Sequence, residues 1–248
     1  MKKKKKIFGL VGRNISYSFS AGYFSKKFKK KGLKHYTYKN FDIDSIEELR
    51  DVITNNKGIK GLNVTIPYKE EVIPLLDSLS KNAKKIGAVN TIVIGKRKIK
   101  GYNTDHYGFR KALKPLLKIN HKKALILGTG GSSKAVAFAL KKLKIEYDFV
   151  SRVGTDTVYG YTDIDENIFQ EYQIIINTTP LGTFPDVEQH PPIDYSLFTK
   201  NHIAFDLIYN PEETTFLKKA KMNGAQVKNG YEMLVYQAEK SWKIWNRK

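Results

Sequence analysis

The sequence of 248 residues contains no cysteine. Without thiols the chain can form no disulfide, no thiolate metal site and no covalent intermediate on sulfur. This absence favours a reducing compartment, and we expect the protein to act in the cytoplasm. Long apolar runs are missing as well. None approaches the roughly eighteen residues that a membrane-spanning helix needs, so we expect no membrane partner.

Acidic residues are scarce relative to basic ones. The chain has 44 Lys and Arg residues against 24 Asp and Glu residues, which gives a net charge of +20. A field of this sign attracts anions, among them nucleotides, small carboxylates and nucleic acids. However, the lysine-rich run 26–31 flanks apolar side chains at Ala21, Phe24 and Phe28, which is the pattern of an amphipathic helix with a solvated face. We therefore expect no obligate nucleic-acid partner. A non-catalytic, basic nucleic-acid-binding protein is the alternative from a different class.

Short apolar runs alternate along the chain with segments of helical periodicity. This order predicts an α/β fold with mostly parallel sheets. The expected strands are Ile7–Val11, Tyr36–Phe41, Gly61–Ile66, Thr91–Ile94, Ala124–Leu127, Tyr147–Val150, Ile174–Asn177, Ile203–Leu207 and Gln226–Lys228. The expected helices between and after them include Ser45–Asn55, Tyr68–Leu76, Asp105–Leu117, Ser133–Leu143, Thr214–Asn223 and Tyr231–Arg247.

A glycine-rich turn lies in the middle of the chain. The run 128–131 reads Gly-Thr-Gly-Gly and joins the expected strand Ala124–Leu127 to the expected helix Ser133–Leu143. Glycines allow a tight turn and a close approach of backbone to phosphate, and a helix N-terminus offers free N–H groups to the same anion. The turn lacks the Gly-Lys-Ser/Thr ending of a Walker loop. It therefore predicts a dinucleotide site.

The next expected strand of the same region favours one cofactor over the other. An NAD site usually places an acidic residue at the end of that strand, where it binds the ribose 2′-hydroxyl. Here the strand Tyr147–Val150 is followed by Ser151 and Arg152. The planar guanidinium of arginine suits a 2′-phosphate. The sequence therefore predicts NADP.

Four polar clusters stand at or next to the ends of the expected strands in the first part of the chain. They offer hydroxyls, carboxamides, one ammonium and one carboxylate, which suit a small polyhydroxylated ligand. Each has a plainer interpretation: the serines can cap the helix that follows, the asparagines can bind the backbone in turns, and Asp105 can cap its own helix. The clusters are 16–20, 63–69, 90–91 and 103–105.

The order and spacing of these clusters decide between the interpretations. Together with the glycine-rich turn they resemble the shikimate dehydrogenase family over nearly the whole chain. The matching motifs are Ser-Phe-Ser at 18–20, Asn-Val-Thr-Ile-Pro-Tyr-Lys at 63–69, Gly-Ala-Val-Asn-Thr at 87–91, Asn-Thr-Asp at 103–105, Asn-Thr-Thr-Pro-Leu-Gly at 177–182, Asp-Leu-Ile-Tyr at 206–209 and the run 229–237. The chain departs from the family pattern at Tyr17, where histidine is common, and at Val153, where threonine is usual.

The resemblance implies NADP-dependent, reversible reduction of 3-dehydroshikimate to shikimate in chorismate and aromatic amino-acid biosynthesis. It implies an α/β fold of two domains. Residues 1–104 would form an α/β substrate-binding and catalytic domain with a mostly parallel sheet, completed by the returning C-terminal helix, 233–248. Residues 105–232 would form a Rossmann-like NADP-binding domain. A quinate/shikimate dehydrogenase with relaxed cofactor use is the nearest alternative.

The resemblance also assigns roles to residues, and it implies a small-molecule substrate and a monomer or homodimer. No metal is needed, because the cofactor carries the hydride. Lys69 and Asp105 match the family's catalytic pair. The implied substrate-binding residues are Ser18, Ser20, Thr65, Asn90, Tyr209 and Gln237. The implied cofactor-binding residues are Gly128, Gly130, Gly131, Ser132, Ser151, Arg152, Thr178, Leu207 and Gly230.

Overall fold

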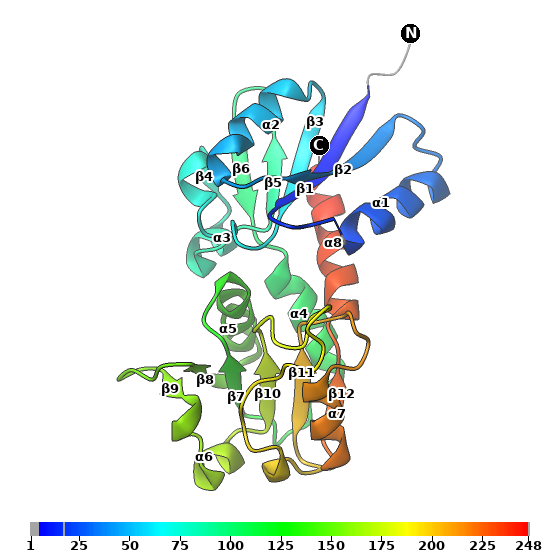
Figure 1. Ribbon diagram of the computed structural model, residues 1–248. Helices are drawn as coiled ribbons and strands as arrows, with labels where there is room; N and C mark the ends of the chain where they lie inside the picture. The colour runs from blue at the N-terminus through cyan, green and yellow to red at the C-terminus, as the bar shows by residue number, and fades with distance from the viewer. Residues whose placement is uncertain (1–4, 17, 248) are drawn as a thin grey trace. The chain divides into compact units, whose positions relative to one another are not determined.

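The computed structural model of the protein describes residues 5–16 and 18–247, so Tyr17 lies outside the described residues. The chain divides into two compact units (Figure 1). Unit 1 comprises Met1–Thr104 and Ala238–Lys248, and unit 2 comprises Asp105–Gln237. The sequence placed the return to the first domain at residue 233, whereas the units divide after Gln237.

Unit 1 contains a sheet of six strands in the order β2-β1-β3-β5-β6-β4. The pairs β1–β2, β1–β3 and β4–β6 are parallel, whereas β5 runs antiparallel to both of its neighbours. The strands are β1 (Lys6–Gly12), β2 (Tyr36–Asp42), β3 (Ile59–Val64), β4 (Ser78–Leu79), β5 (Thr91–Ile94) and β6 (Ile99–Tyr102). The helices are α1 (Phe19–Lys30), α2 (Leu49–Asn55), α3 (Lys81–Ile86) and the end of α8 (Tyr231–Trp245).

Each face of this sheet is covered by a separate hydrophobic core, and the alternation of side chains along β1 shows why. Ile7 and Val11 point into one core, and Phe8 and Leu10 point into the other. A strand that is buried on both faces has to be apolar throughout, which is the reason for the continuous apolar run in the sequence. The second core is largely aromatic and includes Trp245 from α8.

Helix α1 is amphipathic, as its sequence predicts. Phe24 and Phe28 are buried, whereas Lys26 and Lys30 are exposed to solvent.

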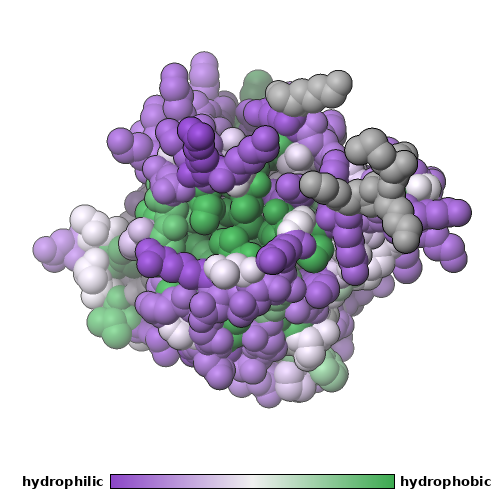
Figure 2. Space-filling view, turned by 90° about the horizontal axis from the view of Figure 1, so that it is seen from above, coloured by the Kyte–Doolittle hydropathy of each residue, from purple (hydrophilic) through white to green (hydrophobic). Residues whose placement is uncertain are grey.

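Figure 2 shows one face of the molecule, on which hydrophilic residues surround an apolar area. Within the part of the chain that the structure describes, no helix combines the length and the apolar character needed to cross a membrane.

One local prediction for unit 1 was wrong. The segment Tyr68–Leu76 does not form the expected α-helix. It forms turns and a short 3-10 helix, Ile73–Leu75. Pro74 lies in this segment and cannot donate the backbone hydrogen bond of a continuing helix. The sequence analysis did not predict strand β6. Pairing with β5 and the tight turn between the two strands impose its extended conformation. In this turn the N–H of Gly95 donates to the carbonyl of Lys98 at 2.9 Å.

Unit 2 contains a second six-stranded sheet, in the order β12-β11-β10-β7-β8-β9, and every pair of neighbours is parallel. Its strands are β7 (Lys123–Leu127), β8 (Glu146–Ser151), β9 (Tyr159–Gly160), β10 (Ile174–Asn177), β11 (Ile203–Asp206) and β12 (Gln226–Lys228). Its helices are α4 (Asp105–Leu113), α5 (Gly131–Leu143), α6 (Glu166–Glu171), α7 (Thr215–Met222) and the beginning of α8.

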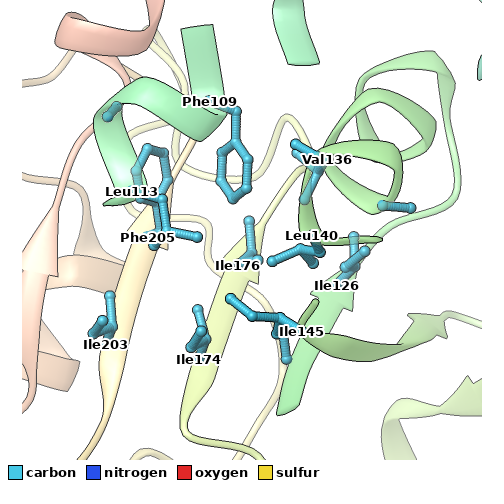
Figure 3. Close-up of a cluster of buried hydrophobic side chains, with 14 of the residues drawn as sticks. Phe109, Leu113, Ile126, Val136, Leu140, Ile145, Ile174, Ile176, Ile203 and Phe205 are labelled. Atoms are coloured by element: carbon cyan, nitrogen blue, oxygen red, sulfur yellow. The ribbon is translucent and has the colours of Figure 1, made fainter. Parts of the chain in front are cut away.

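This sheet is also buried on both faces. Ile174 and Ile176 of β10 point into the core under α4 and α5, where they meet side chains such as Phe109 and Leu140 (Figure 3). Ile175, between them, points into the core on the other face. The predicted α/β fold with mostly parallel sheets is therefore confirmed.

Gly61 marks a close approach between β3 and α8 within unit 1. A Cβ atom on Gly61 would lie 2.1 Å from Nε1 of Trp245, whose indole N–H donates to the carbonyl of Ile92 at 2.9 Å. We expect Gly61→Ala to lower the free energy of unfolding by about 1–3 kcal/mol, the usual cost of overpacking, as measured by urea denaturation.

Gly22 provides the matched control for this substitution. It lies in α1, and a Cβ atom there would meet nothing within 4 Å. Gly22→Ala should therefore raise the free energy of unfolding by about 0.5–1 kcal/mol through helix propensity. Equal stability changes in the two variants would show that the Trp245 contact imposes no constraint on Gly61.

Candidate functional site

The carboxyl ends of the parallel strands in unit 2 bring together the predicted cofactor residues. Strand order reverses at β7, which has β8 on one side and β10 on the other. Open α/β sheets bind nucleotides outside the carboxyl ends of their strands at such a switch point. Gly128 follows β7, Ser151 ends β8, Thr178 follows β10, and Leu207 follows β11.

The glycine-rich turn has the backbone geometry that a pyrophosphate site requires. Gly128 has φ +105°, and a Cβ atom there would lie 2.9 Å from Oγ1 of Thr178. Gly130 precedes α5, carries no capping side chain, and would place a Cβ atom in open space. Ser133 closes the first turn by donating its hydroxyl to the carbonyl of Gly130 at 2.6 Å. The backbone at the start of α5, from Gly131 onward, therefore has the geometry that fits a phosphate group of NADP.

The end of β8 carries positive charge and no carboxylate. Ser151 ends the strand, and the exposed Arg152 follows it directly. Burial raises the pKa of Tyr161 to about 12, and the charge of Arg152 partly opposes this rise. The guanidinium and the phenol are therefore within electrostatic range of each other. The guanidinium of Arg152 fits a 2′-phosphate, and neither Ser151 nor Arg152 supplies the carboxylate that usually binds a 2′-hydroxyl.

A buried carboxylate, Asp206, lies at the end of β11 and is fully shielded from solvent. It accepts hydrogen bonds from Oγ1 of Thr214 at 2.6 Å, the N–H of Ile208 at 3.0 Å and Nδ2 of Asn177 at 3.2 Å. These three donors favour the ionised form, but desolvation outweighs them and raises the pKa of Asp206 to about 7. Asp206 is the first residue of the motif at 206–209, but the sequence alone assigned it no role.

Hydrogen bonds around Asp206 and Asn177 hold the carboxyl ends of β7, β10 and β11 in register. The N–H of Leu207 donates to the carbonyl of Asn177 at 3.0 Å, and the side-chain oxygen of Asn177 accepts from the N–H of Thr179 at 3.0 Å. Thr178 donates through both its N–H and its hydroxyl to the carbonyl of Leu127, at 2.9 and 2.7 Å. The loops that carry Thr178 and Leu207 are thus fixed relative to the glycine-rich turn.

Gly230 completes this group of predicted cofactor residues. Its N–H donates to the carbonyl of Ile208 at 2.9 Å, and a Cβ atom on it would lie 2.0 Å from the carbonyl oxygen of Leu207. No side chain can be accommodated at that distance from a backbone oxygen. The structure therefore brings Gly230 and Leu207 together at the edge of the sheet.

In unit 1, the predicted substrate residues gather at one edge of the sheet. Because β5 is antiparallel to β3 and β6, its beginning lies beside their carboxyl ends: Asn63 pairs with Thr91, and Thr91 pairs with Tyr102. The segments after β1, after β3 and before β5 carry the predicted site residues Ser18, Ser20, Thr65, Lys69 and Asn90.

Ser18 is the N-cap of α1, which confirms the plainer interpretation of this residue. Its side-chain oxygen accepts from the N–H of Ser20 at 3.2 Å. This bond uses one lone pair and leaves the hydroxyl proton of Ser18 available to an anion. Ser18 is half-buried, whereas Ser20 is 7% exposed.

Backbone hydrogen bonds anchor the segment of Thr65 and Lys69. The N–H of Thr65 donates to the carbonyl of Val11 at 2.9 Å, and the N–H of Val89 donates to the carbonyl of Lys69 at 2.7 Å. Between them, Tyr68 is buried, and its hydroxyl donates to the carbonyl of Ile43 at 2.8 Å. The half-buried side chains of Thr65 and Lys69 therefore project from a rigid segment.

Three predicted residues belong to unit 2 rather than unit 1. Asp105 is the first residue of α4 and is 5% exposed. Tyr209 follows β11, and Gln237 is the last residue of unit 2, within α8. Lys69 and Asp105 thus come from different units. Among residues 5–16 and 18–247, no group of three or more side chains has the ligands to hold a metal ion.

The fold and these residues define the class of the protein: an α/β protein of two units, the second of the Rossmann-like, dinucleotide-binding type. A family model described as the shikimate dehydrogenase substrate binding domain matches residues 10–92. A shikimate dehydrogenase (NADP(+)) of Methanococcus aeolicus is 39% identical over 98% of this chain and 92% of its own length.

Two solved structures extend the comparison to the fold. A shikimate dehydrogenase in complex with NADP+ superposes with a TM-score of 0.85 at 37% identity, covering 98% of this chain and 90% of the other. The enzyme of Thermus thermophilus, in complex with NADP(H) and shikimate, has a TM-score of 0.85 at 29% identity, covering 97% and 93%. The chain belongs to the shikimate dehydrogenase family, and the resemblance seen in the sequence is confirmed.

Proposed function

We propose that the protein is an NADP-dependent shikimate dehydrogenase that interconverts 3-dehydroshikimate and shikimate through Lys69 and Asp105. The observation that carries the proposal is the match to NADP-dependent family members over 98% of the chain, with Lys69 and Asp105 in the motifs that define the family. We expect the enzyme to act in the cytoplasm as a monomer or homodimer, with a small molecule as its substrate.

Lys69 handles the proton of the reaction. NADP, when bound, carries the hydride that joins or leaves the ring carbon. The ammonium of Lys69 gives a proton to the carbonyl oxygen during reduction and stabilises the negative charge that develops there. In the direction of oxidation its neutral amine accepts the hydroxyl proton. Asp105 orients the ammonium and accepts a hydrogen bond from a ring hydroxyl.

The other predicted residues bind the substrate and the cofactor. Ser18 and Ser20 hold the substrate carboxylate through hydroxyl donors, and the remaining four substrate residues, Thr65, Asn90, Tyr209 and Gln237, contact its hydroxyls or carboxylate. Gly128, Gly130, Gly131 and Ser132 hold the pyrophosphate, Ser151 and Arg152 hold the 2′-phosphate, and Thr178, Leu207 and Gly230 line the nicotinamide side.

An absorbance assay for reduced nicotinamide tests this function directly. Purified protein is offered shikimate or quinate, each with NADP or NAD. We expect rapid reduction of NADP with shikimate. Equal or faster turnover of quinate with NAD would instead identify a quinate/shikimate dehydrogenase. No reduction in any combination would contradict a dehydrogenase function, and DNA binding at physiological salt would then test the nucleic-acid alternative.

Arg152 should determine the cofactor preference. We expect Arg152→Ala to lower kcat/KM for NADP on the order of 10- to 100-fold, because a charged hydrogen bond to the 2′-phosphate is lost, and to leave kcat/KM for NAD unchanged. Arg110→Ala removes an exposed arginine of α4 in the same unit and serves as the control. Equal losses with both cofactors would show that Arg152 does not read the 2′-phosphate.

A further inference from the structure

Three buried polar side chains of unit 1 form a hydrogen-bonded chain that the proposed chemistry does not use. The hydroxyl of Tyr38, on β2, donates to Oδ1 of Asn63, on β3, at 2.9 Å. Nδ2 of Asn63 in turn donates to Oγ of Ser241, on α8, at 3.2 Å. The exposed fractions are 7% for Tyr38, 4% for Asn63 and 0% for Ser241. Polar groups buried to this extent are retained only where their hydrogen bonds are satisfied.

Tyr38, on β2, stands at one end of the chain and is held by the packing of its ring. Stacking on Phe24 fixes the Tyr38 ring, with ring centroids 4.7 Å apart and ring planes inclined by 9°. The hydroxyl of Tyr38 is therefore held in place to donate to Asn63.

The other end of the chain reaches Asn90. Oγ of Ser241 lies 2.8 Å from Oγ1 of Thr91 and 3.1 Å from Oγ1 of Thr104. Thr104 accepts from Nδ2 of Asn90 at 2.9 Å, and the N–H of Thr104 donates to Oδ1 of Asn90 at 2.7 Å. Thr91 donates its hydroxyl to the same Asn90 oxygen at 3.1 Å. The two threonines that set the orientation of the Asn90 carboxamide are thus both held by Ser241.

We propose that Tyr38 and Ser241 are positioning residues of the substrate site, which orient Asn90 through this buried chain. The inference rests on the proposed function, because Asn90 is a substrate ligand only in a shikimate dehydrogenase. Preorganised ligands lose less side-chain entropy on binding, so the chain raises affinity for the substrate without touching it. Sequence reasoning missed both residues, since a tyrosine and a serine far apart in the chain carry no motif.

Tyr38→Phe tests the first end of the chain by removing only the hydroxyl. We expect KM for shikimate to rise about threefold, because Asn63 loses the buried donor that holds it against Ser241, while KM for NADP stays within about twofold. Tyr36→Phe is the matched control. It removes a hydroxyl from the same strand that accepts from Nζ of Lys6 at 2.9 Å, and it should change neither constant. Calorimetric titration with shikimate alone should show the same loss of affinity for Tyr38→Phe.

Two further variants distinguish positioning from general stability. If Tyr38 acts through Ser241, the double variant Ser241→Ala/Tyr38→Phe should have the same KM for shikimate as Ser241→Ala alone. Ser241→Ala should raise KM for shikimate about three- to tenfold, since Thr91 and Thr104 lose their common partner. The thermal midpoint Tm of each variant is measured alongside to report folding.

The outcomes separate the two claims. If the wild-type protein is folded but inactive with shikimate, this result contradicts the proposed function, and the positioning roles that depend on it as well. Active wild-type protein with an unchanged KM for shikimate in Tyr38→Phe, or with a lower Tm alone, would overturn the positioning role and leave the function intact. Multiplicative effects of Tyr38→Phe and Ser241→Ala would also overturn it.

Discussion

Replacing Lys69 by alanine is expected to lower kcat for shikimate oxidation by about 10²-fold or more, the usual contribution of a general acid–base group. The segment of Lys69 is anchored at the edge of the unit 1 sheet, with its carbonyl bound to the N–H of Val89 at 2.7 Å. Truncation should therefore remove the ammonium and leave the surrounding backbone in place. Initial-rate kinetics with shikimate and NADP varied independently, together with Tm, measure the effect.

The control for this variant is Lys60→Ala, which removes an exposed lysine from β3 of the same unit. It lowers the net charge equally and should leave kcat unchanged, so any effect of bulk electrostatics appears in both variants. A different result would assign a different role: if kcat for Lys69→Ala stays within a few-fold and KM for shikimate rises, Lys69 binds the substrate and does not transfer the proton.

Asp206 should make the stability of the protein fall as the pH rises. Burial raises the pKa of this carboxyl from 3.8 to about 7 in the folded state. Between these two pH values the unfolded chain has released the proton and the folded protein still binds it, so the folded state loses its advantage with increasing pH. A shift of about three pKa units corresponds to about 4 kcal/mol in the free energy of unfolding.

Urea denaturation at a series of pH values between 4 and 8 measures this decline. Asp206→Asn has no group to titrate, so the free energy of unfolding of the wild type relative to the variant should fall across this range. Asp194→Asn is the control, because Asp194 is exposed and hydrogen bonds from Ser196 lower the pKa of its carboxyl. The ionised carboxylate of Asp194 therefore stabilises the folded protein at pH values above the normal pKa of aspartate, and this stabilisation is lost at lower pH. Parallel pH curves for the wild type and Asp206→Asn would show that Asp206 is already ionised in acid.

Much of the fold could be predicted because it depends on local patterns. The apolar run of β7, the glycines at 128–131 and the alanine-rich α5 follow each other directly in the sequence, so the strand, the turn and the helix were expected with nearly correct bounds. The polar clusters at strand ends were also visible, because the carboxyl ends of parallel strands share one edge of a sheet. The membership of the family followed from the order of these motifs.

The sequence by itself determined the α/β class, the dinucleotide turn and the residue types of the candidate site, since each depends on neighbours within a few positions. Only the tertiary structure decided which side chains meet. Ser241 reaches Asn63 across 178 positions, and Asp206 meets Asn177 across 29. The desolvation that raises the pKa of Asp206, and the partners that hold Tyr38, depend on packing between distant elements, and no local pattern records that packing.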